Sequence, residues 1–151
     1  MIILKILIDG DSCPVIPEVL GIAEKMDIDV LVFRSLAHFS NDFPKGKIIY
    51  VDDTPQSVDI QLANRVKAGD VVVTGDYGLA ALVIGRGAGA ITPRGRILDK
   101  HNIDQALLKR HLGAKIRRMG GRIKGPSKIL TEDIDRFKDR LIYLLETKKS
   151  R

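Results

Sequence analysis

The sequence predicts an α/β fold: a three-layer α/β/α domain with a mostly parallel central sheet of about five strands, followed by C-terminal helices. Two observations predict this class. Short β-rich runs alternate with helical patterns over the first two thirds of the chain, and the run at 71–74 contains three successive valines, as a strand covered on both faces requires. Strands that alternate with helices are joined by right-handed crossovers and lie parallel. We expect residues 1–151 to form a single domain.

Each expected element follows from its local pattern. The apolar residues Val15, Val19, Ile22 and Met26 recur at spacings of four, three and four, which is typical of an amphipathic helix. Similar reasoning predicts strands over 2–8, 28–33, 47–51, 71–74 and 88–92, and helices over 54–66 and 79–84. Beyond residue 100 the pattern is helical, with one helix over 102–118, a glycine-containing loop over 119–127 and a last helix from 131.

Composition excludes several classes of protein. The chain has 151 residues with 44% hydrophobic content, which is typical of a globular protein and not of a disordered one. A single cysteine, Cys13, excludes a disulfide framework and a Cys-rich zinc site, and three histidines argue against a zinc–imidazole cluster. No apolar run reaches the roughly 18 residues of a membrane span, and the first run has the pattern of a buried strand and not of a signal peptide. We therefore expect a cytoplasmic protein.

The net charge of +6 conceals an uneven distribution along the chain. Residues 1–80 contain seven Lys and Arg against twelve Asp and Glu, whereas residues 81–151 contain 18 against seven. A basic segment beside an acidic site can hold a phosphate backbone. The residues that we expect to do so are Arg94, Arg117, Arg118, Arg122 and Lys124. The alternative interpretation is a solvated basic helix face with an adjoining loop.

Four aspartates are candidate site residues. Asp9 and Asp11 follow the first strand, Asp76 follows the fourth, and Asp59 lies in the first turn of the preceding helix. Ligands of parallel sheets bind outside the carboxyl ends of the strands, near the point where strand order reverses. Carboxylates gathered there repel one another unless a cation intervenes, and Mg²⁺ or Mn²⁺ prefers such oxygen ligands. Taken singly, each aspartate also fits a capping or turn role.

Several motifs, in order, resemble the YaiI/YqxD family of bacterial proteins. They lie at residues 7–14, 58–59, 73–80, 92–95, 101–104 and 125–127, and the likeness continues into the last helix. That family is grouped by resemblance with PIN-like domains, many of which are metal-dependent ribonucleases. The resemblance implies a PIN-like fold in which Asp9, Asp59 and Asp76 match the family's acids. PIN nucleases commonly carry one more acid on a helix, a place that Glu18, Glu24 or Asp11 could take.

Three functions follow as hypotheses. The first is a Mg²⁺- or Mn²⁺-dependent nuclease acting on RNA or single-stranded nucleic acid, with the four aspartates as catalytic and metal-binding residues. The second is a phosphatase that resembles the haloacid-dehalogenase type, with Asp9 as nucleophile and Asp11 as acid/base. The third is a non-catalytic protein that binds nucleic acid. Only seven aromatic residues are present, so recognition by base stacking has little support.

Overall fold

The α/β class predicted from the sequence is confirmed. A computed structural model describes residues 4–11, 13–36, 48–51, 57–122 and 128–149. The six strands are β1 (Lys5–Asp9), β2 (Asp29–Ser35), β3 (Ile48–Val51), β4 (Val71–Val73), β5 (Gly89–Ile91) and β6 (Ile97–Leu98). The five helices are α1 (Ile16–Met26), α2 (Ser57–Arg65), α3 (Tyr77–Gly85), α4 (Ile103–Arg118) and α5 (Thr131–Lys149).

One six-stranded sheet runs through the molecule in the order β3-β2-β1-β4-β5-β6. All its neighbouring strands are parallel except β5 and β6, which form an antiparallel pair. From β1 the chain proceeds to β2 and β3 on one side, and then crosses to β4 and β5 on the other. The order therefore reverses between β1 and β4, which is where ligands of such sheets bind.

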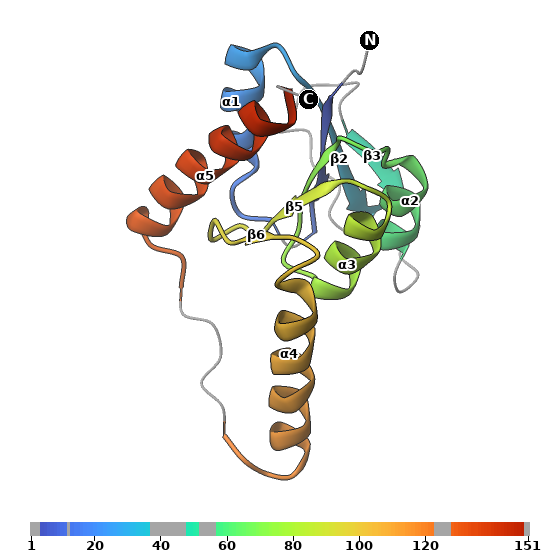
Figure 1. Cartoon of the computed structure of the whole chain (residues 1–151), viewed down its shortest axis with the longest axis vertical. Helices are drawn as coiled ribbons and strands as arrows, with labels where there is room; N and C mark the ends of the chain where they lie inside the picture. Colours follow the sequence, from blue (N-terminus) through green and yellow to red (C-terminus); the bar gives the residue numbers. More distant parts are fainter. Residues whose placement is uncertain (1–3, 12, 37–47, 52–56, 123–127, 150–151) are drawn as a thin grey trace.

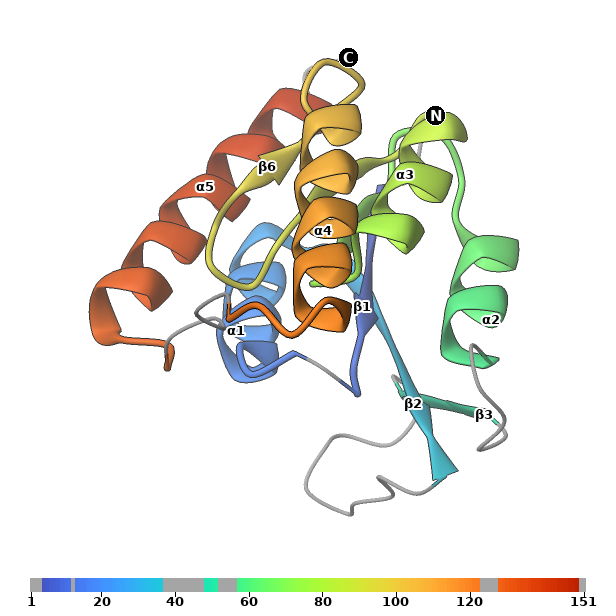
Figure 2. The same ribbon diagram turned by 90° about the horizontal axis from the view of Figure 1, so that it is seen from below.

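Helices cover both faces of this sheet, giving the predicted three layers (Figures 1 and 2). Successive side chains of a strand point to opposite faces. Ile6 and Ile8 of β1 accordingly pack in the cluster that includes α1 and α5, whereas Leu7 packs in the cluster of α2, α3 and α4. All three are fully buried, and each such side chain stabilises the fold by about 2 kcal/mol. Packing on both faces therefore fixes the positions of the carboxyl ends of β1 and β4.

The structure adds one strand to the expected five. β6 has only two residues, too few to produce an alternating pattern, and it pairs with β5 through a hairpin. Gly95 lies in the turn with a φ of +90°, a left-handed conformation that favours glycine. The turn could therefore be recognised from the sequence, but β6 is too short for its pairing with β5 to be predicted. None of the helices in the described ranges combines the length and apolarity needed to cross a membrane.

Candidate functional site

A hydrogen-bonded chain joins the carboxyl ends of β1 and β4. The hydroxyl of Thr74, which is fully buried, donates a hydrogen bond to Oδ2 of Asp9 at 2.9 Å. The same hydroxyl oxygen accepts a hydrogen bond from the backbone N–H of Asp76 at 3.0 Å. Asp9 is itself buried at the end of β1. Thr74 therefore sets the position of one aspartate and the backbone of another, at the point where the strand order reverses.

Asp76 caps helix α3. Its Oδ1 accepts hydrogen bonds from the backbone N–H groups of Gly78 at 2.8 Å and Leu79 at 3.2 Å. These are groups that a helix leaves without internal partners in its first turn. The capping role and the position at the strand edge are both observed, so the two interpretations of Asp76 are compatible.

Asp59 lies close to both Asp9 and Asp76. Burial raises the pKa of its carboxyl to about 6, and the negative charges of Asp76 and then Asp9, with a hydrogen bond to Asp76, raise it in the same direction. Like charges act in this way only when they are near one another. Asp59 and Asp76 also line one cavity, and Thr74 links Asp9 to the backbone of Asp76, so three of the four predicted aspartates are brought together, from β1, α2 and the start of α3.

Asp11 lies at the end of a different strand. Its Oδ1 accepts a hydrogen bond from the backbone N–H of Ser35, the last residue of β2, at 3.0 Å. The side chain is exposed. The structure thus places Asp11 beside β2, on the side of β1 away from β4 and Asp76. Its role as a metal ligand stays a prediction.

Glu18 is a further carboxylate near Cys13, in the first turn of α1. Its Oε2 is buried and has no hydrogen-bond partner among the described residues, whereas Glu24 is exposed. Burial raises the pKa of the Cys13 thiol to about 12, and the charges of Asp9 and Glu18 raise it too. Both carboxylates therefore lie near this thiol, which keeps its proton at neutral pH and packs against the core.

Arg110 of α4 was not among the predicted site residues. Its Nη1 lies 3.6 Å from Oδ1 of Asp76. Arg110 follows Ile103 by seven residues and Ala106 by four, so it falls on the helix face that those buried residues occupy. A charged residue at an apolar position of a helix was the sequence signal that could have identified it.

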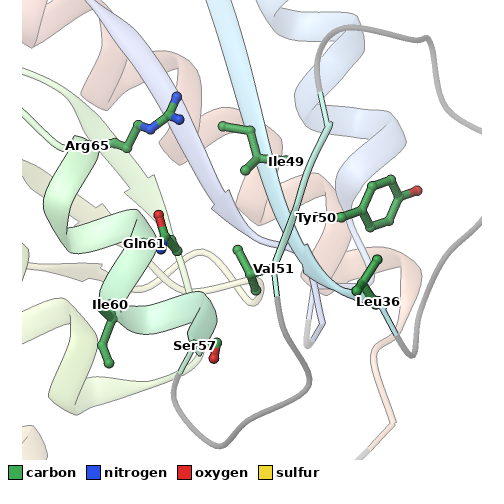
Figure 3. Close-up of a pocket in the computed structure, with 8 residues that line it drawn as sticks. All are labelled: Leu36, Ile49, Tyr50, Val51, Ser57, Ile60, Gln61 and Arg65. Atoms are coloured by element: carbon green, nitrogen blue, oxygen red, sulfur yellow. The ribbon is translucent and has the colours of Figure 1, made fainter.

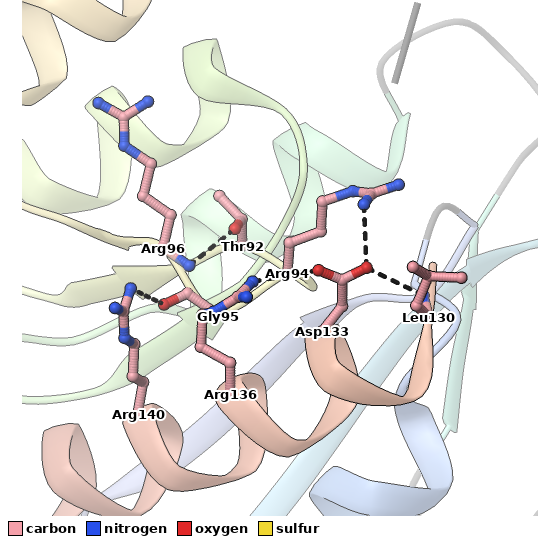
Figure 4. Close-up of polar contacts among 8 residues, drawn as sticks. All are labelled: Thr92, Arg94, Gly95, Arg96, Leu130, Asp133, Arg136 and Arg140. Atoms are coloured by element: carbon pink, nitrogen blue, oxygen red, sulfur yellow. Dashed lines mark hydrogen bonds and ion pairs between the residues drawn. The ribbon is translucent and has the colours of Figure 1, made fainter. Parts of the chain in front are cut away.

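The predicted phosphate-binding residues are divided by the structure. Arg94, in the β5–β6 turn, forms an ion pair with Asp133 of α5 at 3.2 Å, as Figure 4 shows. Asp133 also accepts the Leu130 N–H at 2.9 Å and pairs with Arg136 at 3.1 Å. The Leu130 N–H, with both arginines, holds the pKa of Asp133 below its usual range. Arg94 therefore joins the hairpin to α5 and is not paired with any of the four aspartates.

The remaining predicted basic residues lie toward the far end of α4. Arg117 and Arg118 are exposed in its last turn, and Arg122 is exposed just beyond it. Lys124 lies outside the described residues. Helix α4 extends away from the sheet (Figure 1). These arginines therefore lie further along the helix that carries Arg110, at its end away from the sheet.

Two cavities flank helix α2. The first, of about 300 Å³, lies between α2 and α3 and is lined by Asp59, Asp76, Ile60 and Leu82, among others. The second, of about 560 Å³, lies between α2 and the edge strand β3 (Figure 3). It contains none of the four aspartates, and Ile60 lines both cavities. The cavity at the aspartates is thus the smaller one.

Comparison with known proteins identifies relatives over nearly the whole chain. The sequence profile described as "Uncharacterized BCR, YaiI/YqxD family" matches residues 7–147. A UPF0178 protein of Alkaliphilus metalliredigens is 42% identical over 95% of this chain and 92% of its own length. One of Clostridium tetani is 42% identical over 94% and 97%. A solved structure, a variant of Rae1 (YacP) from Bacillus subtilis, aligns over 97% of this chain and 98% of that chain, with a TM-score of 0.46 and 13% identity.

Proposed function

The chain belongs to the YaiI/YqxD family, and we propose that it is a divalent-metal-dependent nuclease that hydrolyses phosphodiester bonds of RNA or another single-stranded nucleic acid. The observation that carries the proposal is the convergence of Asp9, Asp59 and Asp76 where the strand order reverses. The resemblance of these acids to those of PIN-like nucleases, many of which cleave RNA, supports the same activity. We place it in the cytoplasm.

The donor set fits a hard divalent cation by its chemistry. Carboxylate oxygens are the ligands that Mg²⁺ and Mn²⁺ prefer, and a cation would offset the repulsion that adds to burial in raising the pKa of Asp59. In the described part of the chain, no three His, Cys, Asp or Glu side chains are arranged so that they could hold a metal ion. Coordination therefore requires these carboxylates to turn, and Asp59 is partly exposed in the first turn of α2.

The chain's own residues would supply orientation and charge. Thr74 holds the carboxylate of Asp9 toward β4, and the α3 backbone orients Asp76. Arg110 of α4 lies on the side of Asp76 away from α2, and it would contribute a positive charge toward a phosphate oxygen. A bound Mg²⁺ or Mn²⁺ would lower the pKa of a water molecule and offset charge on the phosphate.

We assign the fourth acidic position to Glu18. Its buried, unpartnered oxygen and its position in the first turn of α1, near the Cys13 thiol that Asp9 also influences, support this assignment over Glu24, which is exposed on the same helix. Glu18→Gln is expected to lower cleavage at least tenfold, about 1.4 kcal/mol of transition-state stabilisation, and Glu24→Gln is the matched control. Equal cleavage rates in the Glu18→Gln and Glu24→Gln variants would reject Glu18 and favour Asp11 as the fourth acid.

The basic residues would bind the phosphate backbone. Arg117, Arg118 and Arg122 are exposed on the extension of α4 that continues from Arg110. Each phosphate contact that they make would steepen the dependence of binding on salt concentration. Binding by Arg94, which is paired with Asp133, and by Lys124 stays a prediction.

The decisive experiment is hydrolysis of labelled single-stranded RNA in Mn²⁺. Asp9→Asn and Asp76→Asn are expected to abolish cleavage while keeping the fold, since an asparagine can accept the Thr74 hydroxyl and can cap α3. Asp29→Asn is the matched control, because Asp29 is an exposed aspartate at the opposite end of β2. Identical rates in all four proteins would exclude the nuclease.

One observation favours the phosphatase as a second candidate. The hydroxyl of Thr74 lies 2.9 Å from Asp9, beside the carboxylate that would act as nucleophile. Beryllium fluoride imitates a phosphoryl group on an aspartate, so an adduct on Asp9, with turnover of a phosphate monoester, would establish this activity. Salt-sensitive binding of RNA without turnover in any metal would instead indicate the non-catalytic protein.

A further inference from the structure

The cleft between α2 and α3 presents aliphatic side chains to solvent beside two carboxylates. Ile60 is 55% exposed and Leu82 is 48% exposed, and both line the cavity that Asp59 and Asp76 also line. Isolated apolar side chains on a surface need no explanation, but here two from different helices share one cavity with candidate site residues. The cavity of about 300 Å³ therefore has an apolar part and an acidic part.

Gly78 leaves the cleft open between these parts. It precedes Leu82 by one helical turn, and a Cβ built on it would lie 3.2 Å from Oδ1 of Asp76. A side chain at this position would occupy the space beside the Asp76 carboxylate. A flat group that rests against Leu82 can therefore reach the carboxylate along the surface of α3.

The positive charge lies on the other side of Asp76. Helix α3 contacts α2 on one side and α4 on the other, and Figure 2 shows the three helices on the same face of the sheet. Asp76 caps the N-terminus of α3, the middle helix. Ile60 and Leu82 line the cavity between α3 and α2. On the α4 side, Nη1 of Arg110 lies 3.6 Å from Oδ1 of Asp76. The aliphatic and acidic groups of the cleft thus lie on the α2 side of α3, and a basic group lies on its α4 side.

We propose that the cleft binds one unpaired nucleobase against Ile60 and Leu82, while the adjoining phosphate of the strand lies toward Arg110. The inference rests on the proposed function, since it makes single-stranded nucleic acid the substrate of this site. A nucleobase is neutral, so the carboxylates do not repel it. Its two apolar faces can pack against the aliphatic side chains. When no cation is bound, a phosphate is repelled by Asp59 and Asp76 and is attracted by the guanidinium of Arg110.

This arrangement selects for strandedness. Bases of a duplex are paired and stacked, so one can enter the cleft only after it has been unstacked, at the free-energy cost that base flipping carries. An unpaired base in a flexible single strand enters without this cost. We expect a single strand to bind more tightly than the duplex of the same sequence at the same salt concentration.

The test is fluorescence anisotropy with a short labelled oligouridine and with its duplex, in Ca²⁺ and in Mn²⁺. Ile60→Ser and Leu82→Ser are each expected to weaken binding of the single strand about five- to tenfold, the loss expected when an aliphatic contact of this size is removed. Leu108→Ser and Leu112→Ser are matched controls. These leucines are 57% and 48% exposed and lie on α4, outside the cleft. The controls are expected to bind within about twofold of the unmodified chain.

The outcomes separate this inference from the proposed function. Cleft variants that bind like the controls overturn the inference, whether or not the protein cleaves RNA. A protein that binds duplex as tightly as single strand also overturns it. Loss of binding confined to the cleft variants, with no cleavage in Mn²⁺, supports the inference and rejects the nuclease. Absence of any binding to either probe overturns the inference.

Discussion

Lys5 and Asp70 form a partly buried ion pair that joins the starts of β1 and β4. The Nζ atom of Lys5 lies 2.6 Å from Oδ2 of Asp70, which is 1% exposed. Asp70 also accepts the backbone N–H groups of Lys5 at 3.2 Å and Lys67 at 2.8 Å. The same two strands carry Asp9 and Thr74 at their opposite ends. Asp70 is therefore held by β1 and by the turn before β4, at the end of the sheet opposite to Asp9 and Asp76.

Lys5→Met is expected to lower the free energy of unfolding by about 3 kcal/mol, because it leaves a buried carboxylate without its counter-ion. Urea denaturation monitored by circular dichroism measures the change. The double variant Lys5→Met/Asp70→Asn should recover part of the loss, since the remaining amide is neutral. A loss below about 1 kcal/mol would mean that the two backbone N–H groups alone satisfy Asp70.

Thr74→Val is expected to destabilise the fold by about 2 kcal/mol, because it removes a buried donor to Asp9 and a buried acceptor for the Asp76 N–H. Valine keeps the shape of threonine, so packing changes little. Thr74→Ser keeps the hydroxyl and should retain most of the hydrogen-bonding contribution. Equal unfolding free energies for the valine and serine variants would show that the hydroxyl contributes nothing.

Gly10→Ala is expected to cost about 2 kcal/mol through overpacking between β1 and β2. A Cβ at Gly10 would lie 2.8 Å from the carbonyl oxygen of Phe33 and 2.6 Å from Cγ of Arg34. The Gly10 N–H donates to that same Phe33 oxygen at 2.8 Å, so the backbone cannot withdraw freely.

Gly21→Ala is the control for the Gly10 variant. Gly21 lies in helix α1, and a Cβ there meets nothing within 4 Å. Alanine is the better helix former, so this variant should be more stable by up to about 1 kcal/mol. Thermal unfolding of both variants should therefore move in opposite directions. Destabilisation by both changes would contradict the steric explanation for Gly10.

The fold and three of the four aspartates could be predicted because both depend on local patterns. Buried parallel strands produce continuous apolar runs, and the residues that follow them must lie at the carboxyl edge of the sheet. Asp9 and Asp76 are placed by this rule alone. The same rule could also have favoured Glu18 over Glu24 as a residue at the carboxyl edge. A crossover helix begins at that edge and runs back, so only its first turn can lie near Asp9.

The rest depends on tertiary packing that leaves little trace in the sequence. The contact of Arg110 with Asp76 requires the angle at which α4 crosses α3, which local propensity does not determine. The sequence predicts Arg94 at the phosphates because it follows a strand, but its ion-pair partner is Asp133, 39 residues later. Long-range pairs of this kind follow from how α5 packs on the sheet and not from any nearby motif.

Asp59 gives the protein a pH-dependent stability that can be measured without divalent cation. The pKa of its carboxyl is raised from 3.8 to about 6 in the folded protein, by burial first and then by Asp76 and Asp9. The folded state therefore holds this proton more tightly than the unfolded chain does. Its contribution to stability is fully present below about pH 4 and is lost as the pH rises to about 6. Because the side chain is partly exposed, solvent screening limits the effect to about 1 kcal/mol.

The measurement is the side-chain carboxyl chemical shift of Asp59 across a pH titration in EDTA. Asp76→Asn should lower the pKa of Asp59, since it removes the charge that comes second only to burial among the causes. Asp59→Asn should flatten the decline in unfolding free energy between about pH 4 and pH 6, whereas Asp29→Asn should leave it intact. A pKa of Asp59 near 4 in the unmodified protein, unmoved by Asp76→Asn, would show that the carboxylates do not lie close together in solution.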